Sequence, residues 1–242
     1  MTYLLTLILL LLTWTPNSWA DKNDLRFINP ISQEEFKNLS KQAGTAISYT
    51  PLAPAAPLGL LGFDIGVEVT AVNINEKADF WKNLTANGNP PDYLLLPKIH
   101  AQKGLPLGLD VGVVYSKLPQ SNISLIGGEV KWALLSGSAV TPAVAIRGDY
   151  TRLLGVSDLE LQTYGVDLSV SKGIAFLTPY AGIGELWINS QETSDLVSLN
   201  KENLNQTKGF VGIKAKFFIL SVVAEADFAT IPSYSLRTNI SF

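Results

Sequence analysis

The chain ends with Tyr234-Ser-Leu-Arg-Thr-Asn-Ile-Ser-Phe242, in which apolar and polar residues alternate up to the last position. Successive side chains of a β-strand point to opposite faces, so this stretch predicts a strand with one apolar face and one polar face. The apolar face reaches the terminal phenylalanine, and no chain follows to cover it. The stretch therefore predicts the closing strand of an antiparallel β-barrel that sits in lipid.

The amino-terminal residues predict export. A predominantly apolar run, Leu4 to Leu12, precedes small residues at Ser18 and Ala20. This arrangement is typical of a secretory signal peptide over residues 1–20, cleaved before Asp21, although no Lys or Arg precedes the apolar run. A membrane anchor is the alternative interpretation, and the shortness of the run disfavours it.

The composition excludes several classes of function. The chain has no cysteine, which removes disulfide and thiolate chemistry from an exported protein. Its net charge of -3 and its pI near 5.2 come without a basic patch, so nucleic-acid binding is not expected. No cofactor is predicted. After the signal peptide, no stretch approaches the ~20 apolar residues of a transmembrane helix.

Residues 21–60 differ from the rest of the chain. Ser32 and Glu35 fit a helix capping box, and Phe36 opens an apolar helical face. We expect a short amphipathic helix that ends at Gly44, followed by a proline-rich extended linker over residues 51–57. Three interpretations remain open for this segment, namely a cap that packs against the periplasmic rim of the barrel, a plug inside its lumen, or a tether.

From residue 61 onward, apolar and polar residues alternate with a period of two. Such runs, about nine to twelve residues long, suit tilted strands that cross a bilayer. The pattern slips near Thr163, which indicates a bulge or a misplaced boundary. We predict about ten strands, with eight or twelve as alternatives. They span residues 61–74, 94–104, 106–117, 121–135, 140–153, 158–171, 174–190, 207–217, 219–229 and 232–242.

The lengths of the connections predict the orientation. If the first strand rises from the periplasm, the two longest connections, residues 75–93 and 191–206, both lie on the outer side. The connections on the other side are short. Outer-membrane barrels show this asymmetry. An even number of strands also places the beginning of the first strand and the end of the last strand on the periplasmic side.

The charged residues share strand faces, as a membrane barrel requires. A charge on the lipid face costs about 2 to 4 kcal/mol at mid-bilayer, so these side chains are expected in the lumen. Their mixed signs indicate cross-strand ion pairs in a narrow barrel. The predicted lumen residues are Asp64, Glu68, Lys98, His100, Asp110, Glu129, Lys131, Arg147, Asp149, Asp167, Glu185, Lys214, Lys216, Glu225, Asp227 and Arg237.

A soluble barrel has the same period with its faces exchanged, so a second signal is needed. Aromatic residues stand at strand ends, among them Tyr93, Trp187 and Phe242, which suits the aromatic girdles of a membrane barrel. The sequence resembles the small integral β-barrel proteins of the Gram-negative outer membrane, through its signal peptide, its amphipathic strands and its terminal strand. The resemblance implies that Tyr234, Leu236, Ile240 and Phe242 form the insertion signal read by the barrel-assembly machinery. It is silent on activity.

Candidate chemistry is sparse. His100 is the only histidine and is a candidate general base for an outer-membrane hydrolase, but its strand places it away from the outer rim. The paired acids Glu225 and Asp227 have no nucleophile beside them in sequence. Neither a histidine cluster nor a tight carboxylate cluster suggests a metal site.

The sequence thus predicts a monomeric, non-enzymatic outer-membrane barrel that contacts outer-membrane lipid. Its expected role is structural or that of a porin-like narrow channel for small solutes. The alternative is an adhesin-like, surface-binding barrel that acts through residues 75–93 and 191–206, with Phe80, Trp81 and Leu84 as a contact helix. A hydrolase that uses His100 is least favoured.

Overall fold

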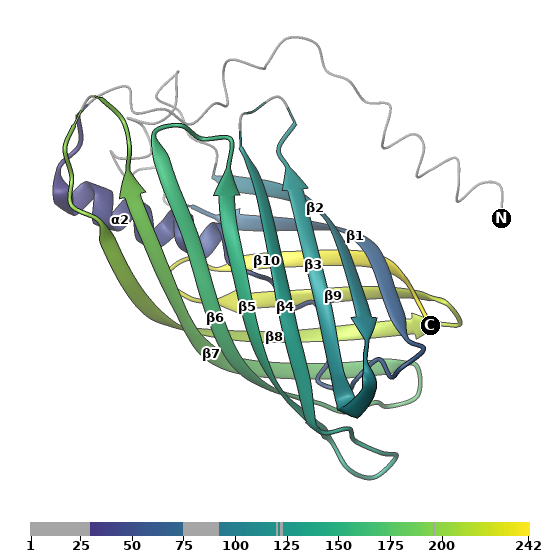
Figure 1. Ribbon diagram of the computed structural model, residues 1–242. Helices are drawn as coiled ribbons and strands as arrows, with labels where there is room; N and C mark the ends of the chain where they lie inside the picture. The colour runs from purple at the N-terminus through teal and green to yellow at the C-terminus, as the bar shows by residue number, and fades with distance from the viewer. Residues whose placement is uncertain (1–29, 75–91, 120, 122, 196) are drawn as a thin grey trace.

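The computed structural model describes residues 30–74, 92–119, 121, 123–195 and 197–242. In this part of the chain, ten antiparallel strands form a closed barrel in the order β1-β10-β9-β8-β7-β6-β5-β4-β3-β2. Among the described residues that precede the barrel, 33–47 form an α-helix, α2 (Gln33–Ile47) (Figure 1). The predicted all-β barrel of about ten strands is confirmed.

The strands lie close to their predicted positions. They are β1 (Phe63–Asn73), β2 (Tyr93–Gly104), β3 (Leu109–Lys117), β4 (Ser124–Leu135), β5 (Ala143–Leu154), β6 (Leu159–Ser171), β7 (Leu177–Glu192), β8 (Glu202–Phe217), β9 (Leu220–Phe228) and β10 (Ser233–Ser241), with the short helix η1 (Pro106–Gly108) between β2 and β3. β8 begins five residues before its predicted start at residue 207, so the connection shortens from the predicted 191–206 to 193–201. The predicted connection 75–93, with Phe80, Trp81 and Leu84, falls largely outside the described residues.

The barrel closes through β1 and β10. The register pairs Glu68 with Arg237 and Ile65 with Ile240, and the backbone N–H of Phe242 donates to the carbonyl of Phe63 at 3.0 Å. The rings of Phe63 and Phe242 pack with centroids 4.7 Å apart. The terminal strand therefore forms the seam of the barrel, with Tyr234, Leu236, Ile240 and Phe242 all exposed on its outward face.

The outward face of the barrel is an apolar belt. Large aliphatic side chains are exposed on it all round the barrel, such as Val67, Ile99, Val113, Ile183 and Val211, and the exposed fraction of Ile183 reaches 61%. The inward positions of the same strands are mostly polar or charged. This is the arrangement of a transmembrane barrel, because a water-soluble barrel would bury the apolar face. Within the described residues, no helix has the length and apolarity needed to span a bilayer.

The two ends of the barrel differ. Residues 105–108, 136–142, 172–176 and 218–219 join strands at one end, which we call the short-turn end. The other end, the long-connection end, carries residues 74–92 and 193–201 together with three shorter connections. β7 and β8 are 16 residues each, longer than the roughly 9 to 11 residues that cross a bilayer. At the long-connection end their outward residues are polar, such as Asn189 in β7 and Asn203 in β8.

Helix α2 begins as predicted and ends later. Ser32 and Glu35 form the capping box, with the Ser32 side chain accepting from the Glu35 backbone N–H. Gly44 was expected to end the helix, but the helix continues through it to Ile47. An added Cβ at Gly44 would lie 2.4 Å from Cγ2 of Ile188 in β7. The glycine is therefore a point of close contact between helix and strand, and the expectation of a stop there was wrong.

The helix lies inside the long-connection half of the barrel. Phe36, Leu39 and Ile47 of α2 pack into one apolar cluster with inward side chains of the strands, including Leu161 of β6 and Ile188 of β7. The helix contacts β5, β6, β7 and β8. The helix lies at this end because the inner wall is apolar there and can bury the apolar face of α2.

The same cluster explains two errors in the assignment of faces. β6 alternates regularly through Thr163, without a bulge, and its inward residues Leu159 and Leu161 contact the cluster. In β7 the inward residues are Leu186 and Ile188, so Glu185 lies on the outward face, where it accepts a hydrogen bond of 2.7 Å from Thr207 Oγ1. Polar residues were assigned to the lumen throughout, and this rule fails where the lumen holds an apolar helix.

Candidate functional site: a filled, charged lumen

The lumen is occupied by the chain itself. Residues 33–58, which we call the lumen segment, comprise α2 and the extended proline-rich stretch that follows it. This stretch contacts inward side chains of strands on several sides of the barrel: Tyr49 meets β2, Leu52 meets β9 and β10, Pro54 meets β4, and Leu58 meets β3. The lumen segment therefore fills the interior through contacts distributed around its wall.

Most predicted lumen residues do face inward. Twelve of them are buried, namely Asp64, Glu68, Lys98, His100, Asp110, Glu129, Lys131, Arg147, Asp167, Glu225, Asp227 and Arg237. Asp149 and Lys214 are also inward but less completely covered. Lys216 shares the strand face of Lys214 and is exposed at the short-turn rim, and Glu185 is the one member that faces outward.

One group of these residues surrounds His100. Glu68 lies 3.1 Å from Lys98 Nζ and 3.4 Å from Nδ1 of His100. Arg237 is a permanent donor, so its contact of 2.5 Å makes Nδ1 of His100 the acceptor. The proton then sits on Nε2, which donates to the Tyr49 hydroxyl at 2.7 Å. Both ring nitrogens are engaged, and a serine hydroxyl is not among these partners, so the geometry gives the hydrolase hypothesis no support.

A second group links β3 to β6. The register places Asp110, Lys131, Arg147 and Asp167 side by side across four strands. Lys131 Nζ lies 3.0 Å from Asp110, and Arg147 Nε lies 3.0 Å from Glu129 and 3.9 Å from Asp167. Buried charges are tolerated only when they are paired. The acids and bases therefore compensate one another's charge across the barrel, as the mixed signs in the sequence indicate.

The charged residues also bind the main chain of the lumen segment. Lys131 Nζ donates to the carbonyls of Pro54 at 2.9 Å and Ala56 at 3.1 Å. Asp110 accepts from the backbone N–H of Leu58 at 3.1 and 3.2 Å. A stretch rich in proline forms few backbone hydrogen bonds of its own. The barrel wall supplies the missing partners.

Leu52 contacts the barrel wall through both its backbone and its side chain. Its backbone N–H donates to Glu225 at 2.9 Å, and its carbonyl accepts from Arg237 at 2.6 Å. Its side chain is 0% exposed and packs with Tyr180, Phe210 and Val223. The backbone φ of Leu52 is 45°, a left-handed value that is uncommon for a leucine and persists only where the surroundings hold it. Leu52 is the central anchor of the lumen segment.

Sequence reasoning did not find several partners in this network. Lys208 pairs with Asp227 at 3.0 Å and donates to the carbonyl of Tyr49 at 2.6 Å. It shares the strand face of Lys214, so the period-two pattern could have identified it. Tyr49 and Tyr180 carried no such signal, because their roles depend on where the lumen segment lies.

One small cavity lies among these contacts. A cavity of about 20 Å³ lies beside Tyr49, Asp149, Asp167 and Lys208, which is room for about one water molecule. Among the described residues, no group of three or more histidine or acidic side chains is arranged to hold a metal ion. The lumen is therefore a set of ion pairs around a bound segment of the same chain.

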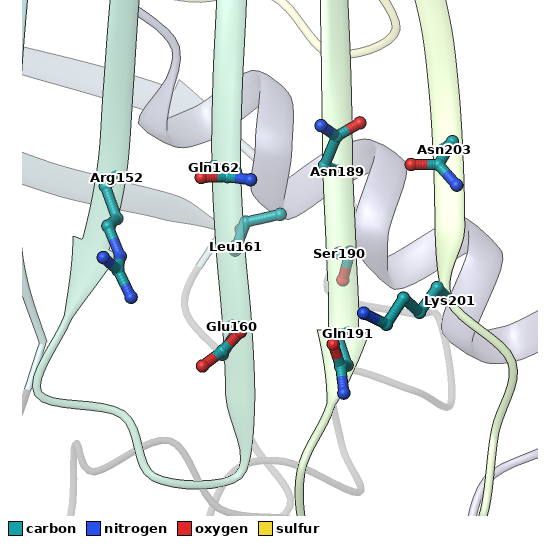
Figure 2. A pocket seen from close by; sticks show the side chains of 9 residues that line it. All are labelled: Arg152, Glu160, Leu161, Gln162, Asn189, Ser190, Gln191, Lys201 and Asn203. Carbon is teal, nitrogen blue, oxygen red and sulfur yellow. The ribbon is translucent and has the colours of Figure 1, made fainter.

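A second polar region lies outside the barrel. At the long-connection end, the outward residues of β6 to β8 beyond Trp187 are polar, and together with Arg152 of β5 they form a surface that we call the crest. It surrounds a depression of about 260 Å³. Figure 2 shows Arg152, Gln162, Asn189 and Asn203 on adjacent strands, with α2 behind them. The residues that line the depression are Arg152, Glu160, Leu161, Gln162, Asn189, Ser190, Gln191, Lys201 and Asn203.

Comparisons with known proteins found similarity only among solved structures. No family model and no curated protein matches the sequence. Among solved structures, the KdgM porin in complex with disordered oligogalacturonate has 9% identity and a TM-score of 0.37, covering 75% of this chain and 99% of that one. The attachment invasion locus protein Ail of Yersinia pestis, in complex with a heparin analogue, has 10% identity and a TM-score of 0.32, covering 75% and 97%. The outer membrane protein Omp33 of Acinetobacter baumannii has 7% identity and a TM-score of 0.31, covering 76% and 100%. These values carry no argument about ligand or activity.

Proposed function

We propose that this chain is a structural outer-membrane barrel that closes its own lumen with residues 33–58. The observation that carries the proposal is the double hydrogen bonding of Leu52 by Glu225 and Arg237. A narrow channel for small solutes would need a continuous path of water, and the lumen segment occupies that path. In this state the barrel therefore does not conduct.

Planar-bilayer conductance tests the proposal with the full-length chain. The unaltered protein is expected to give no steady current. Leu52→Asp places a carboxylate among Tyr180, Phe210 and Glu225, which should expel the lumen segment and open a current. Leu60→Asp is the matched control, because Leu60 is 59% exposed, and it should stay silent. A steady current from the unaltered protein, equal to that of Leu52→Asp, would contradict a closed lumen.

Surface binding is the second candidate, and the crest favours it. Polar side chains on the outward face of a strand are suited to water above the membrane, and the crest carries Arg152 and Lys201 beside several amides. Replacing Arg152, Gln162 and Asn189 together by Ala should lower the adherence of expressing cells to immobilised glycans or matrix proteins. The same number of Ala substitutions in the 136–142 turn, at the opposite end, is the control. Equal adherence of both variants would remove this candidate.

A further inference from the structure

The lumen segment has a direction that can be followed contact by contact. It starts at the long-connection end, where Gln33 binds both main-chain groups of Asn200. Gln33 Nε2 donates to the Asn200 carbonyl at 3.2 Å, and the Asn200 N–H donates to Gln33 Oε1 at 2.9 Å. Asn200 belongs to the connection between β7 and β8. The first turn of α2 is therefore fastened to that mouth of the barrel.

From there the chain runs along the barrel to the opposite end. Ser40 reaches Ser190 at 2.9 Å in the upper part of β7, and Tyr49 meets His100. Leu58 meets Asp110, near the start of β3 at the short-turn end. The chain then enters β1 at Phe63, beside Phe242 (Figure 1). The lumen segment thus traverses the whole length of the barrel in one pass.

The orientation of the barrel decides what this path means. The long connections and the polar crest lie at one end, and the short turns lie with Phe63 and Phe242 at the other. Outer-membrane barrels turn their short connections toward the periplasm and their long ones outward. The first strand then begins on the periplasmic side, while α2 begins on the outer side.

We propose that the lumen segment is a tether that crosses the membrane inside the barrel and presents its amino-terminal end, residues 33–37, on the cell surface. This goes beyond the closure of the lumen, because a plug inserted from the periplasm would close it equally well. Of the three interpretations that the sequence leaves open for this segment, it takes the tether in place of the periplasmic cap or the plug. The start of α2 then forms part of the cell surface next to the crest. Leu52, Pro54 and Leu58 hold the rest of the segment inside the lumen.

Cysteine labelling in intact cells tests the proposal, since the chain has no cysteine of its own. Glu34→Cys and Lys37→Cys place single thiols at exposed positions of α2. Ser198→Cys, in the connection between β7 and β8, marks the long-connection end. Val140→Cys, at a position 87% exposed in the 136–142 turn, marks the other end. The probe is a membrane-impermeant maleimide, and a boiling-dependent gel shift confirms that each variant is folded.

The proposal requires labelling at positions 34, 37 and 198 in intact cells, and labelling at position 140 only after the outer membrane is permeabilised. Labelling at 198 but at neither 34 nor 37 in intact cells would overturn it. Labelling at 140 in place of 198 would overturn it as well, because the barrel would then be inverted. These outcomes are independent of conductance, so a failure here is distinguishable from a failure of the proposed closure.

Discussion

Arg237 shows how one side chain serves both the wall of the barrel and its contents. It lies on β10 with a side chain that is 0% exposed, and it contacts the carbonyl of Leu52, Nδ1 of His100 and, at 3.6 Å, Asp64. A guanidinium can bind several acceptors in a fixed geometry, which a lysine ammonium cannot do equally well. The lumen segment is therefore fixed by a residue that also compensates the acids around it.

Replacing Arg237 by Met should be strongly destabilising. It leaves the Leu52 carbonyl without its donor and Asp64 and Glu68 with less compensation, and breaking a buried ion pair costs about 3 to 5 kcal/mol. We expect the midpoint of unfolding in urea, followed by loss of the heat-modifiable gel form, to fall markedly. Arg152→Met is the control on the outward crest, where an exposed substitution changes stability by about 0.5 kcal/mol or less. Equal midpoints for the two variants would show that Arg237 has no such role.

At the scale of elements, the contact between α2 and β7 depends on the small size of Gly44. A side chain there meets Ile188, which is branched at Cβ and cannot move aside easily. Gly44→Val should therefore push the helix away from β7 and increase trypsin cleavage after Lys37 and Lys41. Adding Ile188→Ala makes room and should restore part of the protection. Equal protection in Gly44→Val and the unaltered chain would contradict close packing at this point.

A second element-scale prediction concerns β8, which lies partly in the belt and partly in the crest. Val211 and Asn203 both face outward on this strand. Val211→Arg should cost about 2 to 4 kcal/mol, because it places a charge on the lipid face. Asn203→Arg should cost little, because the crest stands in water. Unfolding midpoints of the two variants in lipid vesicles measure the difference, and a similar cost at both positions would show that the belt extends to Asn203.

For the whole molecule, the closed ring of strands predicts resistance to detergent. A barrel has no free strand edge, so local opening cannot start at an edge strand. Unheated protein from the membrane fraction should therefore migrate differently in a detergent gel from boiled protein. Recovery in the soluble periplasmic fraction, with one gel position before and after boiling, would contradict the membrane barrel. The ring is closed by the pairing of β1 with β10, so this behaviour depends on that seam.

The strands could be predicted because their signal is local. In β1 and β10 each residue faces either lipid or a polar neighbour, so a period of two appears in the sequence itself. The capping box of α2 is local in the same way, since Ser32 and Glu35 complete it within one turn. The predicted inward position of most charged residues follows from the same alternation, together with the cost of a charge in lipid.

The contents of the lumen could not be predicted in this way. Leu161, Leu186 and Ile188 face inward because an amphipathic helix covers them. The sequences of β6 and β7 contain no signal that predicts this helix. For that reason Glu185 was assigned to the wrong face and Thr163 to a slip in the pattern. The first residues of β8 were not predicted as strand, because their outward residues Asn203 and Asn205 are polar. A strand that lies above the membrane lacks the apolar outward face that marks a membrane-spanning strand.

The sequence alone determined that this chain forms a closed barrel of about ten strands with an apolar exterior, since alternation and the lipid solvent together allow few other solutions. The tertiary structure decided that residues 33–58 fill the lumen and that they run from the long-connection mouth to the start of β1. The physical reason is that the direction of this segment depends on matching its helix to an apolar inner wall and its proline-rich backbone to buried charges. Those partners lie up to 185 residues away in the chain, as Leu52 and Arg237 do, and they meet only in the folded barrel.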